Sequence, residues 1–296
     1  MSKVSFIGLG VMGYPMAGHL ARNGFSVRVY NRTRTKAEQW LAEYGDAGLH
    51  VIADTPREAA IGADVTMLCV GNDDDVRSVV LGADGALAGL AAGTLLIDHT
   101  TASRTLAETL NAACAQANVG FLDAPVSGAT QAAQAGKLMI MVGGSEEIAQ
   151  TLLPIFDALG EKTIILGKQS AGATMKLAIN SVIHSLNQAA AESLNLAQAA
   201  GIELPLAYEA LESSAACAPM LRYRKPLYLD ERAHQVTFTV GLAAKDVDLA
   251  TRLAQSLDVQ MPQAELNLGI LNQASQNGYA NRDMASVISY LKKEQT

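Results

Sequence analysis

The first half of the chain alternates short, continuously apolar runs with segments of helical periodicity. The runs are apolar at most positions, whereas a half-exposed strand would alternate apolar and polar residues. We expect strands at residues 4–7, 27–30, 65–70, 94–98, 120–126, 138–142 and 163–166. Strand–helix–strand repetition of this kind predicts an α/β fold with a parallel, doubly wound sheet.

Two of the helices between these strands have recognisable starts. Residues 35–38 (Thr-Lys-Ala-Glu) and 55–58 (Thr-Pro-Arg-Glu) both fit the capping-box pattern, and the second also has proline at the first helical position. We therefore expect helices to begin at both places.

Past Gly167 the pattern becomes helical throughout. Residues 170–200 contain no proline and one glycine, near the start, and Gly201 stands where a C′ residue belongs. A helix of about 30 residues would be ~45 Å long. Shorter helices are expected at 205–215, 242–257, 263–275 and 283–293. We predict a Rossmann-type NADP-binding domain at 1–167 and an all-α substrate and oligomerisation domain at 168–296, which begins with the long inter-domain helix 170–200.

A GxGxxG motif follows the first predicted strand and opens a helix. In dinucleotide-binding folds the first glycine permits a tight turn, the second lets the backbone approach a pyrophosphate, and the third allows close helix–strand packing. The uncapped helix N-terminus then favours phosphate. The predicted cofactor-binding residues here are Gly8, Leu9, Gly10, Val11, Met12 and Gly13. The alternative is a glycine turn with no ligand.

The residues after the second strand bear on the choice of nicotinamide cofactor. An NAD site usually has Asp or Glu there to bind the ribose 2′-OH. This chain has Asn31, Arg32 and Thr33 instead, so no carboxylate at this point of the sequence would repel a 2′-phosphate. Arg32 can pair with a phosphate, and Asn31 and Thr33 can donate hydrogen bonds. NADP(H) is favoured over NAD(H); the alternative is that Arg32 is a solvated loop cation.

Composition and charge narrow the possible partners. The chain has 296 residues, of which 49% are hydrophobic, and a formal net charge of −7. This acidic balance argues against general nucleic-acid binding. Three cysteines without CxxC spacing fit neither a disulfide framework nor a zinc site, so we expect no metal. No apolar stretch is long enough to span a membrane and no signal-type core is present, so we expect a cytoplasmic protein.

Four segments, in this order and spacing, resemble the motifs of the β-hydroxyacid dehydrogenase family. They are residues 6–20 (FIGLGVMGYPMAGHL), 123–128 (DAPVSG), 172–180 (GATMKLAIN) and 245–250 (KDVDLA). The family includes 3-hydroxyisobutyrate dehydrogenases, tartronate semialdehyde reductases and glyoxylate/succinic semialdehyde reductases. The resemblance covers nearly the whole chain.

The resemblance also implies roles for individual residues. Lys176 would be the catalytic residue, with Asn180 as its neighbour in the substrate site. Ser127 and Gly128 would bind a substrate carboxylate. Many members have a second glycine where this chain has Ala129, and the added methyl group could narrow the pocket. The cofactor would contact Thr101 and Lys245, and we also place Val70 in the cofactor-binding set.

The chemistry of Lys176 and Asn180 can be read without the family. Four residues apart on one helix, they share a face. Hydride arriving at a carbonyl carbon creates an alkoxide, to which an ammonium group supplies a proton and a positive charge. Asn180 can hold the ammonium or share the oxygen, and His184 continues the same face as a packing or pocket-lining residue. Phe238 is a further candidate for either role.

Together these observations predict an NADP(H)-dependent oxidoreductase that interconverts a small β-hydroxyacid and its semialdehyde or oxo acid. Its partner would be a small carboxylate substrate, with no nucleic acid and no membrane, and the alanine-rich long helix suggests a homodimer or homotetramer. Two alternatives are an imine reductase on the same scaffold and a non-catalytic dinucleotide-sensing module. A proton donor such as Lys176 would have no purpose in a sensor.

Overall fold

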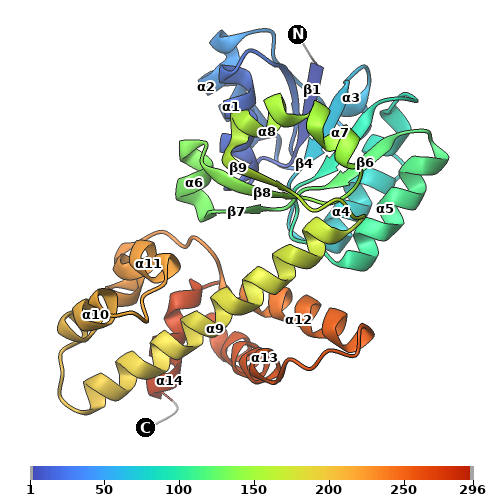
Figure 1. The fold of residues 1–296 in the computed structure, drawn as a ribbon. Helices are drawn as coiled ribbons and strands as arrows, with labels where there is room; N and C mark the ends of the chain where they lie inside the picture. Colours follow the sequence, from blue (N-terminus) through green and yellow to red (C-terminus); the bar gives the residue numbers. More distant parts are fainter. Residues whose placement is uncertain (1–2, 294–296) are drawn as a thin grey trace. The chain divides into compact units, whose positions relative to one another are not determined.

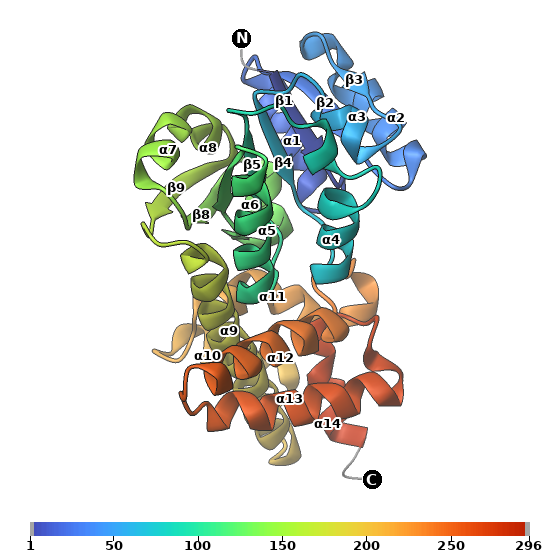
Figure 2. The same ribbon diagram turned by 90° about the vertical axis from the view of Figure 1, so that its right-hand side faces the viewer.

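The longest helix, α9 (Ala171–Ala199), contains the boundary between two units of the chain. The computed structural model describes residues 3–293, and the boundary falls between Lys176 and Leu177. Figures 1 and 2 show the strands in the first unit, coloured blue to green, and the helices of the second unit in yellow to red. The expected long helix is therefore present.

A six-stranded parallel sheet forms the centre of the first unit. Its strand order is β3-β2-β1-β4-β5-β6, so the chain works outward from β1 in one direction and then from β4 in the other. This is the strand order of a Rossmann-type fold, and it confirms the predicted fold class. The strands are β1 (Lys3–Ile7), β2 (Ser26–Tyr30), β3 (Val51–Ile52), β4 (Val65–Leu68), β5 (Leu95–Asp98) and β6 (Gly120–Asp123).

Both faces of this sheet are covered by helices, which explains why the strand sequences are continuously apolar. Successive strand residues point to opposite faces. Phe6 and Met67 pack into one buried cluster with α1, α2 and α8, while their neighbours Ile7 and Leu68 pack into another with α3, α4 and α5. The helices are α1 (Gly13–Arg22), α2 (Arg34–Tyr44), α8 (Leu153–Leu159), α3 (Pro56–Ala60), α4 (Asp73–Leu81) and α5 (Arg104–Gln116).

The run at 120–126, expected to form one strand, forms two strands in different sheets. β6 ends at Asp123, and β7 (Val126–Ser127) pairs antiparallel with β8 (Leu138–Val142) in a second, three-stranded sheet. Pro125 lies between them and has no N–H for a ladder hydrogen bond. The sheet is completed by β9 (Gly160–Ile165), parallel to β8, and nearby lie α6 (Ala129–Ala135) and α7 (Glu146–Thr151).

The two capping-box predictions had different outcomes. Thr55 accepts a hydrogen bond from the Glu58 backbone N–H at 3.0 Å, so this helix is capped as expected, although the Glu58 carboxylate accepts from Asp54 N–H instead of Thr55 N–H. The prediction at 35–38 was wrong. There α2 begins at Arg34, its cap residue makes no side-chain hydrogen bond, and the Glu38 carboxylate binds the Arg34 guanidinium.

The second unit is helical and has its own buried core. A fully buried ion pair joins Arg224 to Asp283 at 2.6 Å, and the Asp283 carboxylate also accepts hydrogen bonds from the backbone N–H groups of Thr237, Phe238 and Ala285. Besides the C-terminal part of α9, the unit contains α10 (Leu204–Ser213), α11 (Pro219–Leu229), α12 (Val240–Ser256), α13 (Pro262–Ala274) and α14 (Val287–Lys293).

Two elements were not expected from the sequence. β3 has only two residues, too few to show a pattern, and α11 contains Pro226 as well as beginning with a proline. Proline inside a helix removes a backbone donor and is normally read as a helix end. Short 3₁₀ segments lie at Gly45–Ala47, Ala86–Gly89, Glu231–Ala233 and Met284–Ser286, and a π-helical turn at Ser275–Tyr279.

Candidate active site

The glycine loop lies at the carboxyl edge of the parallel sheet, between β1 and α1. The strand order reverses between β1 and β4, and ligands of such sheets bind outside the carboxyl ends of the strands at that point. Gly8 has a φ of +97°. A Cβ atom there would collide with the Cys69 carbonyl oxygen and lie 2.8 Å from Val70 Cγ1, just past the end of β4. Only glycine fits this crossing.

Gly10 and Gly13 differ in what surrounds them. A Cβ atom on Gly13 would collide with the carbonyl oxygen of Gly8, because α1 packs tightly under the loop. A Cβ atom on Gly10 would meet nothing within 4 Å. Its lack of a side chain therefore has no explanation in the packing of the protein itself. The N-terminus of α1 has no side-chain cap, so the loop and helix together fit a pyrophosphate.

Asn31 fastens the glycine loop to the end of β2. Its Oδ1 accepts a hydrogen bond from the Leu9 N–H at 2.9 Å, and its Nδ2 donates to the Thr33 carbonyl oxygen at 2.9 Å. Gly8 N–H also donates to the Tyr30 carbonyl oxygen at 2.8 Å. Both ends of the Asn31 amide are thus engaged within the protein, and the residue shapes the loop.

A pocket of about 100 Å³ opens where β2 and β3 end. It contains the arginine singled out in the sequence, Arg32, together with a second arginine, Arg34. The complete lining is Tyr30, Asn31, Arg32, Arg34, Ile52, Ala53 and Asp54.

The fold brings carboxylates to these two arginines that the local sequence does not contain. Arg32 pairs with Asp75 of α4 at 3.1 Å, and Arg34 pairs with Asp54, which follows β3. The expected absence of a carboxylate holds for the residues directly after β2, but carboxylates from other elements pair with both arginines. The expectation considered only the residues after β2, whereas the carboxylates come from positions 20 and 43 residues further along the chain.

The ends of β4 and β5 carry the other predicted cofactor residues of the first unit. Val70 lies two residues past the end of β4, and its N–H donates to Thr100 Oγ1 at 3.1 Å. Thr101 follows immediately. The preceding residues are buried: burial raises the pKa of Asp98 to about 7 and lowers the pKa of His99 to about 4, so His99 is neutral at pH 7 and Asp98 is about half protonated.

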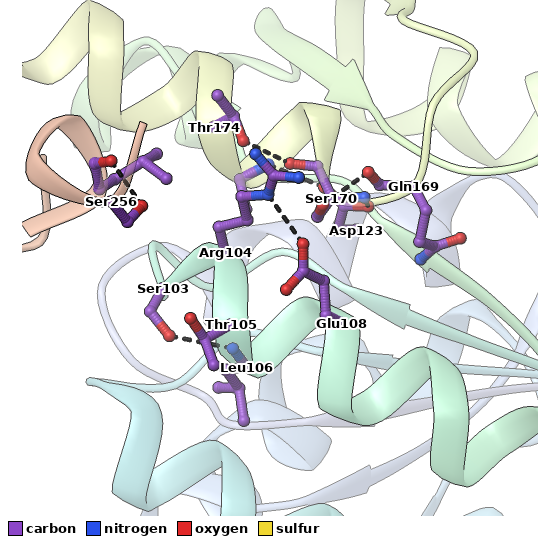
Figure 3. A network of polar contacts seen from close by, with 12 residues as sticks. Ser103, Arg104, Thr105, Leu106, Glu108, Asp123, Gln169, Ser170, Thr174 and Ser256 are labelled. Atoms are coloured by element: carbon purple, nitrogen blue, oxygen red, sulfur yellow. Dashed lines mark hydrogen bonds and ion pairs between the residues drawn. The ribbon is translucent and has the colours of Figure 1, made fainter. Parts of the chain in front are cut away.

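Asp123, at the end of β6, holds the start of α9. Its Oδ1 accepts a hydrogen bond from Ser170 N–H at 2.9 Å and its Oδ2 accepts from Ala173 N–H at 2.8 Å. Figure 3 shows the carboxylate beside Ser170, whose carbonyl oxygen accepts from Thr174 Oγ1 at 2.8 Å. Burial raises the pKa of Asp123 to about 6, against the opposing effect of these N–H groups. A carboxylate from another element thus caps the helix that carries Lys176.

Ser127, Gly128 and Ala129 form the turn from β7 into α6. Gly128 has a φ of +140° and Ala129 a φ of +55°. Ala129 is therefore in the left-handed region, which an L-residue adopts at a cost of about 1–2 kcal/mol. The backbone here is suited to glycine at both positions, and this chain has glycine at only one of them.

Lys176 and Asn180 lie one turn apart on α9, and both are buried: Lys176 is 9% exposed and Asn180 4%. In the second unit the Asn180 Nδ2 donates to Asp246 Oδ2 at 2.5 Å, and Asp246 Oδ1 pairs with the Lys245 ammonium at 3.0 Å. The carboxylate, with no exposed surface, therefore connects two of the predicted residues. It also fixes which end of the Asn180 amide is the donor.

His184 and Phe238 contact each other in the second unit. Their rings stack with centroids 5.7 Å apart and an angle of 27° between the planes. His184 is 4% exposed. Phe238 is partly buried and packs against the core of the unit, and its N–H donates to the Asp283 carboxylate.

The carboxylates described above were not assigned roles from the sequence. Asp123 and Asp246 are within the four motifs, Asp246 directly after Lys245 and Asp123 four residues before Ser127, so their position was a usable signal. Asp54 and Asp75 had no such signal, because their arginine partners are distant in the sequence.

Two kinds of feature are absent from residues 3–293. Within this range no group of three or more His, Cys, Asp or Glu side chains could hold a metal ion. No helix of the same range combines the length and apolarity needed to cross a membrane.

Comparison with known proteins agrees with the geometry. The family model for the NAD-binding domain of 6-phosphogluconate dehydrogenase matches residues 3–167, and the model described as NAD-binding of NADP-dependent 3-hydroxyisobutyrate dehydrogenase matches residues 170–291. The fold and the glycine loop thus define a dinucleotide-dependent oxidoreductase. More specifically, the chain belongs to the 3-hydroxyisobutyrate dehydrogenase, or β-hydroxyacid dehydrogenase, family, which acts on CH–OH groups.

Individual relatives cover the whole length of the chain. An uncharacterised oxidoreductase of Shewanella frigidimarina is 37% identical over 100% of both chains. An NAD-dependent L-serine dehydrogenase of Pseudomonas aeruginosa is 32% identical over 97% of each. The crystal structure of a 3-hydroxyisobutyrate dehydrogenase from Salmonella typhimurium has a TM-score of 0.89 at 29% identity, with coverage of 98% of this chain and 100% of that one.

Proposed function

We propose that this protein interconverts a small β-hydroxyacid and its semialdehyde or oxo acid, with Lys176 as the general acid–base and NADP(H) as the favoured cofactor. The observation that carries the proposal is the buried Lys176, one turn from an Asn180 amide anchored by a buried carboxylate. Residues 1–167 would form the NADP-binding domain, and residues 168–296 the substrate and oligomerisation domain.

The glycine loop is the part of the chain suited to hold the nucleotide. Gly8 and Gly13 let the loop pass closely over β4 and α1, and the open space at Gly10 leaves room for a pyrophosphate. Leu9, Val11 and Met12 complete the loop, with Val70, Thr101 and Lys245 as further cofactor contacts. When bound, the nicotinamide supplies or accepts the hydride.

Lys176 handles the proton of the reaction. In reduction its ammonium group gives a proton to the carbonyl oxygen as that oxygen gains negative charge, and in oxidation the neutral amine takes the proton from the hydroxyl group. Asn180 positions the ammonium: its Nδ2 is held by Asp246, so its Oδ1 is the end that can accept a hydrogen bond from Lys176.

The substrate carboxylate is assigned to Ser127 and Gly128. The Ser127 hydroxyl group is a donor, and the turn at Gly128 presents backbone N–H groups of the kind that bind carboxylates. Ala129 borders the same turn and sets how much room the carboxylate has. A substrate with a carboxylate next to its carbonyl group, or one carbon further, fits two such binding points.

The test is reduction of glyoxylate, with its carboxylate next to the carbonyl group, and of tartronate semialdehyde, with its carboxylate one carbon further, by the Lys176→Ala variant. Its kcat should fall by about 10²–10⁴-fold, while the Kd for NADPH changes less than twofold. Lys168→Ala, which removes an exposed lysine just before α9, is the matched control and should keep normal kcat. Near-normal reduction by Lys176→Ala would refute the role of this lysine. A cyclic imine, assayed in parallel, separates the imine reductase alternative, and absence of all turnover would favour the sensing module.

The cofactor preference rests on Arg32 in the pocket at the end of β2. Arg32→Ala should raise the KM for NADPH about ten- to a hundredfold and the KM for NADH much less, because one charged pairing with phosphate is worth ~1.5–3 kcal/mol. Arg77→Ala, on the exposed side of α4, is the control. Equal effects on the two cofactors would refute the preference.

We also propose that the protein is a homodimer or homotetramer. Aliphatic side chains are exposed in the second unit at Val182 and Leu196 of α9 and at Leu206 of α10, which are 57%, 73% and 61% exposed. Exposed apolar surface of this kind favours burial against another chain. Analytical ultracentrifugation at micromolar concentration tests this, and a monomer would contradict it.

A further inference from the structure

The pocket at the ends of β2 and β3 has an unexpected charge arrangement. Both of its arginines are already paired with carboxylates: Arg32 with Asp75, and Arg34 with Asp54. The arginines are well exposed, with 85% and 58% of their side-chain surface accessible. A ligand phosphate can reach them, but each guanidinium already has an anion beside it.

Local structure holds both carboxylates in place. Asp54 N–H donates to the Glu58 carboxylate at 2.9 Å, directly before the capped start of α3. Asp75 lies in the first turn of α4, where its N–H donates to the cap residue Asn72 at 2.9 Å. The backbone at both aspartates is therefore fixed, and the pairs do not depend on the long arginine side chains alone.

We infer that Asp54 and Asp75 are specificity-determining residues that weaken binding of a 2′-phosphate by occupying Arg34 and Arg32. This rests on the proposed assignment of the pocket to the adenosine ribose of the cofactor. A 2′-phosphate must displace each carboxylate or remain close to it, and like charges at such distances repel. A ribose with a free 2′-OH carries no charge and meets no such repulsion. The carboxylates therefore reduce the preference for NADP(H) over NAD(H) that the arginines create.

The two aspartates have a suitable control in Asp74. It lies between Asp73 and Asp75 in the same turn of α4 and is exposed to solvent. Asp74→Asn removes the same charge from the same unit without releasing Arg32. It therefore separates a local effect on the arginines from a general effect of net charge.

The experiment is calorimetric titration of the full-length protein with 2′,5′-ADP and with 5′-ADP. Asp54→Asn and Asp75→Asn should each tighten 2′,5′-ADP binding about two- to fivefold, the range expected for an exposed charge pair. Binding of 5′-ADP should change less than 1.5-fold, as should both ligands in Asp74→Asn. Because exposed charges are screened by salt, the gain should shrink at 1 M NaCl.

Three outcomes would overturn the inference: unchanged or weaker 2′,5′-ADP binding in both variants, equal tightening of both ligands, or an equal gain in Asp74→Asn. Failure of the proposed cofactor preference is visible separately, in the wild-type protein, as equal affinity for 2′,5′-ADP and 5′-ADP. If the wild type does not discriminate but Asp54→Asn does, the proposed preference fails while the inference stands.

Discussion

The two units contribute candidate site residues that are held in position by different means. In the first unit the glycine loop is shaped mainly by backbone: Gly8 and Gly13 exclude side chains, and the loop is fastened by backbone hydrogen bonds and one amide, that of Asn31. In the second unit the corresponding residues are fixed by buried charge, as Asp246 binds Asn180 and Lys245.

This difference bears on how each unit responds to substitution. A loop shaped by tight backbone packing is destabilised when a side-chain atom is added, because there is no room for it. A structure held by a buried ion pair is destabilised when one partner is removed, because an uncompensated charge then remains in the interior. The first unit should therefore be sensitive to larger residues at Gly8 and Gly13, and the second to loss of individual charges.

The largest loss of stability is expected on substitution of Asp283. Its side chain is 0% exposed and that of its ion-pair partner, Arg224, is 4% exposed. Asp283→Ala leaves the arginine buried and unpaired and removes the acceptor of three backbone N–H groups. The free energy of unfolding of the second unit should fall by about 3–5 kcal/mol. Urea unfolding followed by helical circular dichroism reports both units, and fluorescence of the single tryptophan, Trp40, reports the first unit, so a loss seen by circular dichroism alone belongs to the second.

An exposed ion pair of the same unit provides the contrast. Asp248 pairs with Arg252 one helical turn away, and the two side chains are 36% and 73% exposed. Asp248→Ala should change stability by no more than about 0.5 kcal/mol. Similar losses in the two variants would mean that buried charge is not what holds this unit together.

The next prediction compares the effects on stability and on cofactor binding of alanine at two glycines of the loop. Gly13→Ala places a methyl group against the Gly8 carbonyl oxygen and should destabilise the first unit by about 1–3 kcal/mol. Gly10→Ala meets nothing in the protein, so it should leave the melting temperature nearly unchanged. It should nevertheless weaken dinucleotide binding about tenfold or more, if a pyrophosphate occupies that space. Differential scanning fluorimetry and a binding titration distinguish the two results, and unchanged binding in Gly10→Ala would contradict the site.

The sequence predicted the structure correctly where a residue pattern has a single physical cause. Continuously apolar runs predicted the strands of the parallel sheet, because helices cover both faces. The spacing of Gly8, Gly10 and Gly13 predicted a loop whose geometry the structure contains at Gly8 and Gly13. Pro125 also marks in the sequence where the run at 120–126 divides into two strands, although a single strand was expected there.

Pairings between distant residues could not be predicted in this way. Asp54 and Asp75 approach the two arginines only after β3 and α4 have taken their places. Asp123 reaches the start of α9 from 47 residues away. Charge complementarity has no periodicity, and any of the 29 acidic residues could have been the partner of a given cation.

A pH effect tests the buried interior of the first unit. Burial raises the pKa of Asp98 to about 7, against about 4 when unfolded, so the native state binds more protons between these values. The stability that Asp98 contributes is present below pH ~4 and is lost as pH rises through 7. His99 acts in the opposite sense: its pKa is lowered to about 4, and its contribution is lost as pH falls below ~6.5.

Asp98→Asn removes the first contribution and leaves the second. The free energy of unfolding of the variant, relative to wild type, should therefore increase from pH 4 to 7 and stay constant above that. Trp40 fluorescence in urea, repeated at each pH, measures this difference. Asp46→Asn, at an exposed position, should show no such trend, and a flat difference for Asp98→Asn would mean that the buried carboxyl group is not protonated in the native state.

The smallest effect concerns backbone conformation at one residue of each unit. Ala129 in the first unit and Asp258 in the second both have a φ of +55°. Ala129→Gly relieves the left-handed strain but makes the unfolded chain more flexible, so a net gain of about 0.5–1 kcal/mol is expected. Asp258→Gly should gain less, because Asp tolerates this region better than Ala.

Gly128→Ala is the opposite control: its Cβ would lie 2.5 Å from Ala132 Cβ, so it should destabilise. Equal gains at 129 and 258, measured by urea unfolding, would show that the strain depends on φ alone. A gain at 129 would show that this chain keeps alanine in the turn at a cost in stability, as expected if its methyl group sets the size of the carboxylate pocket.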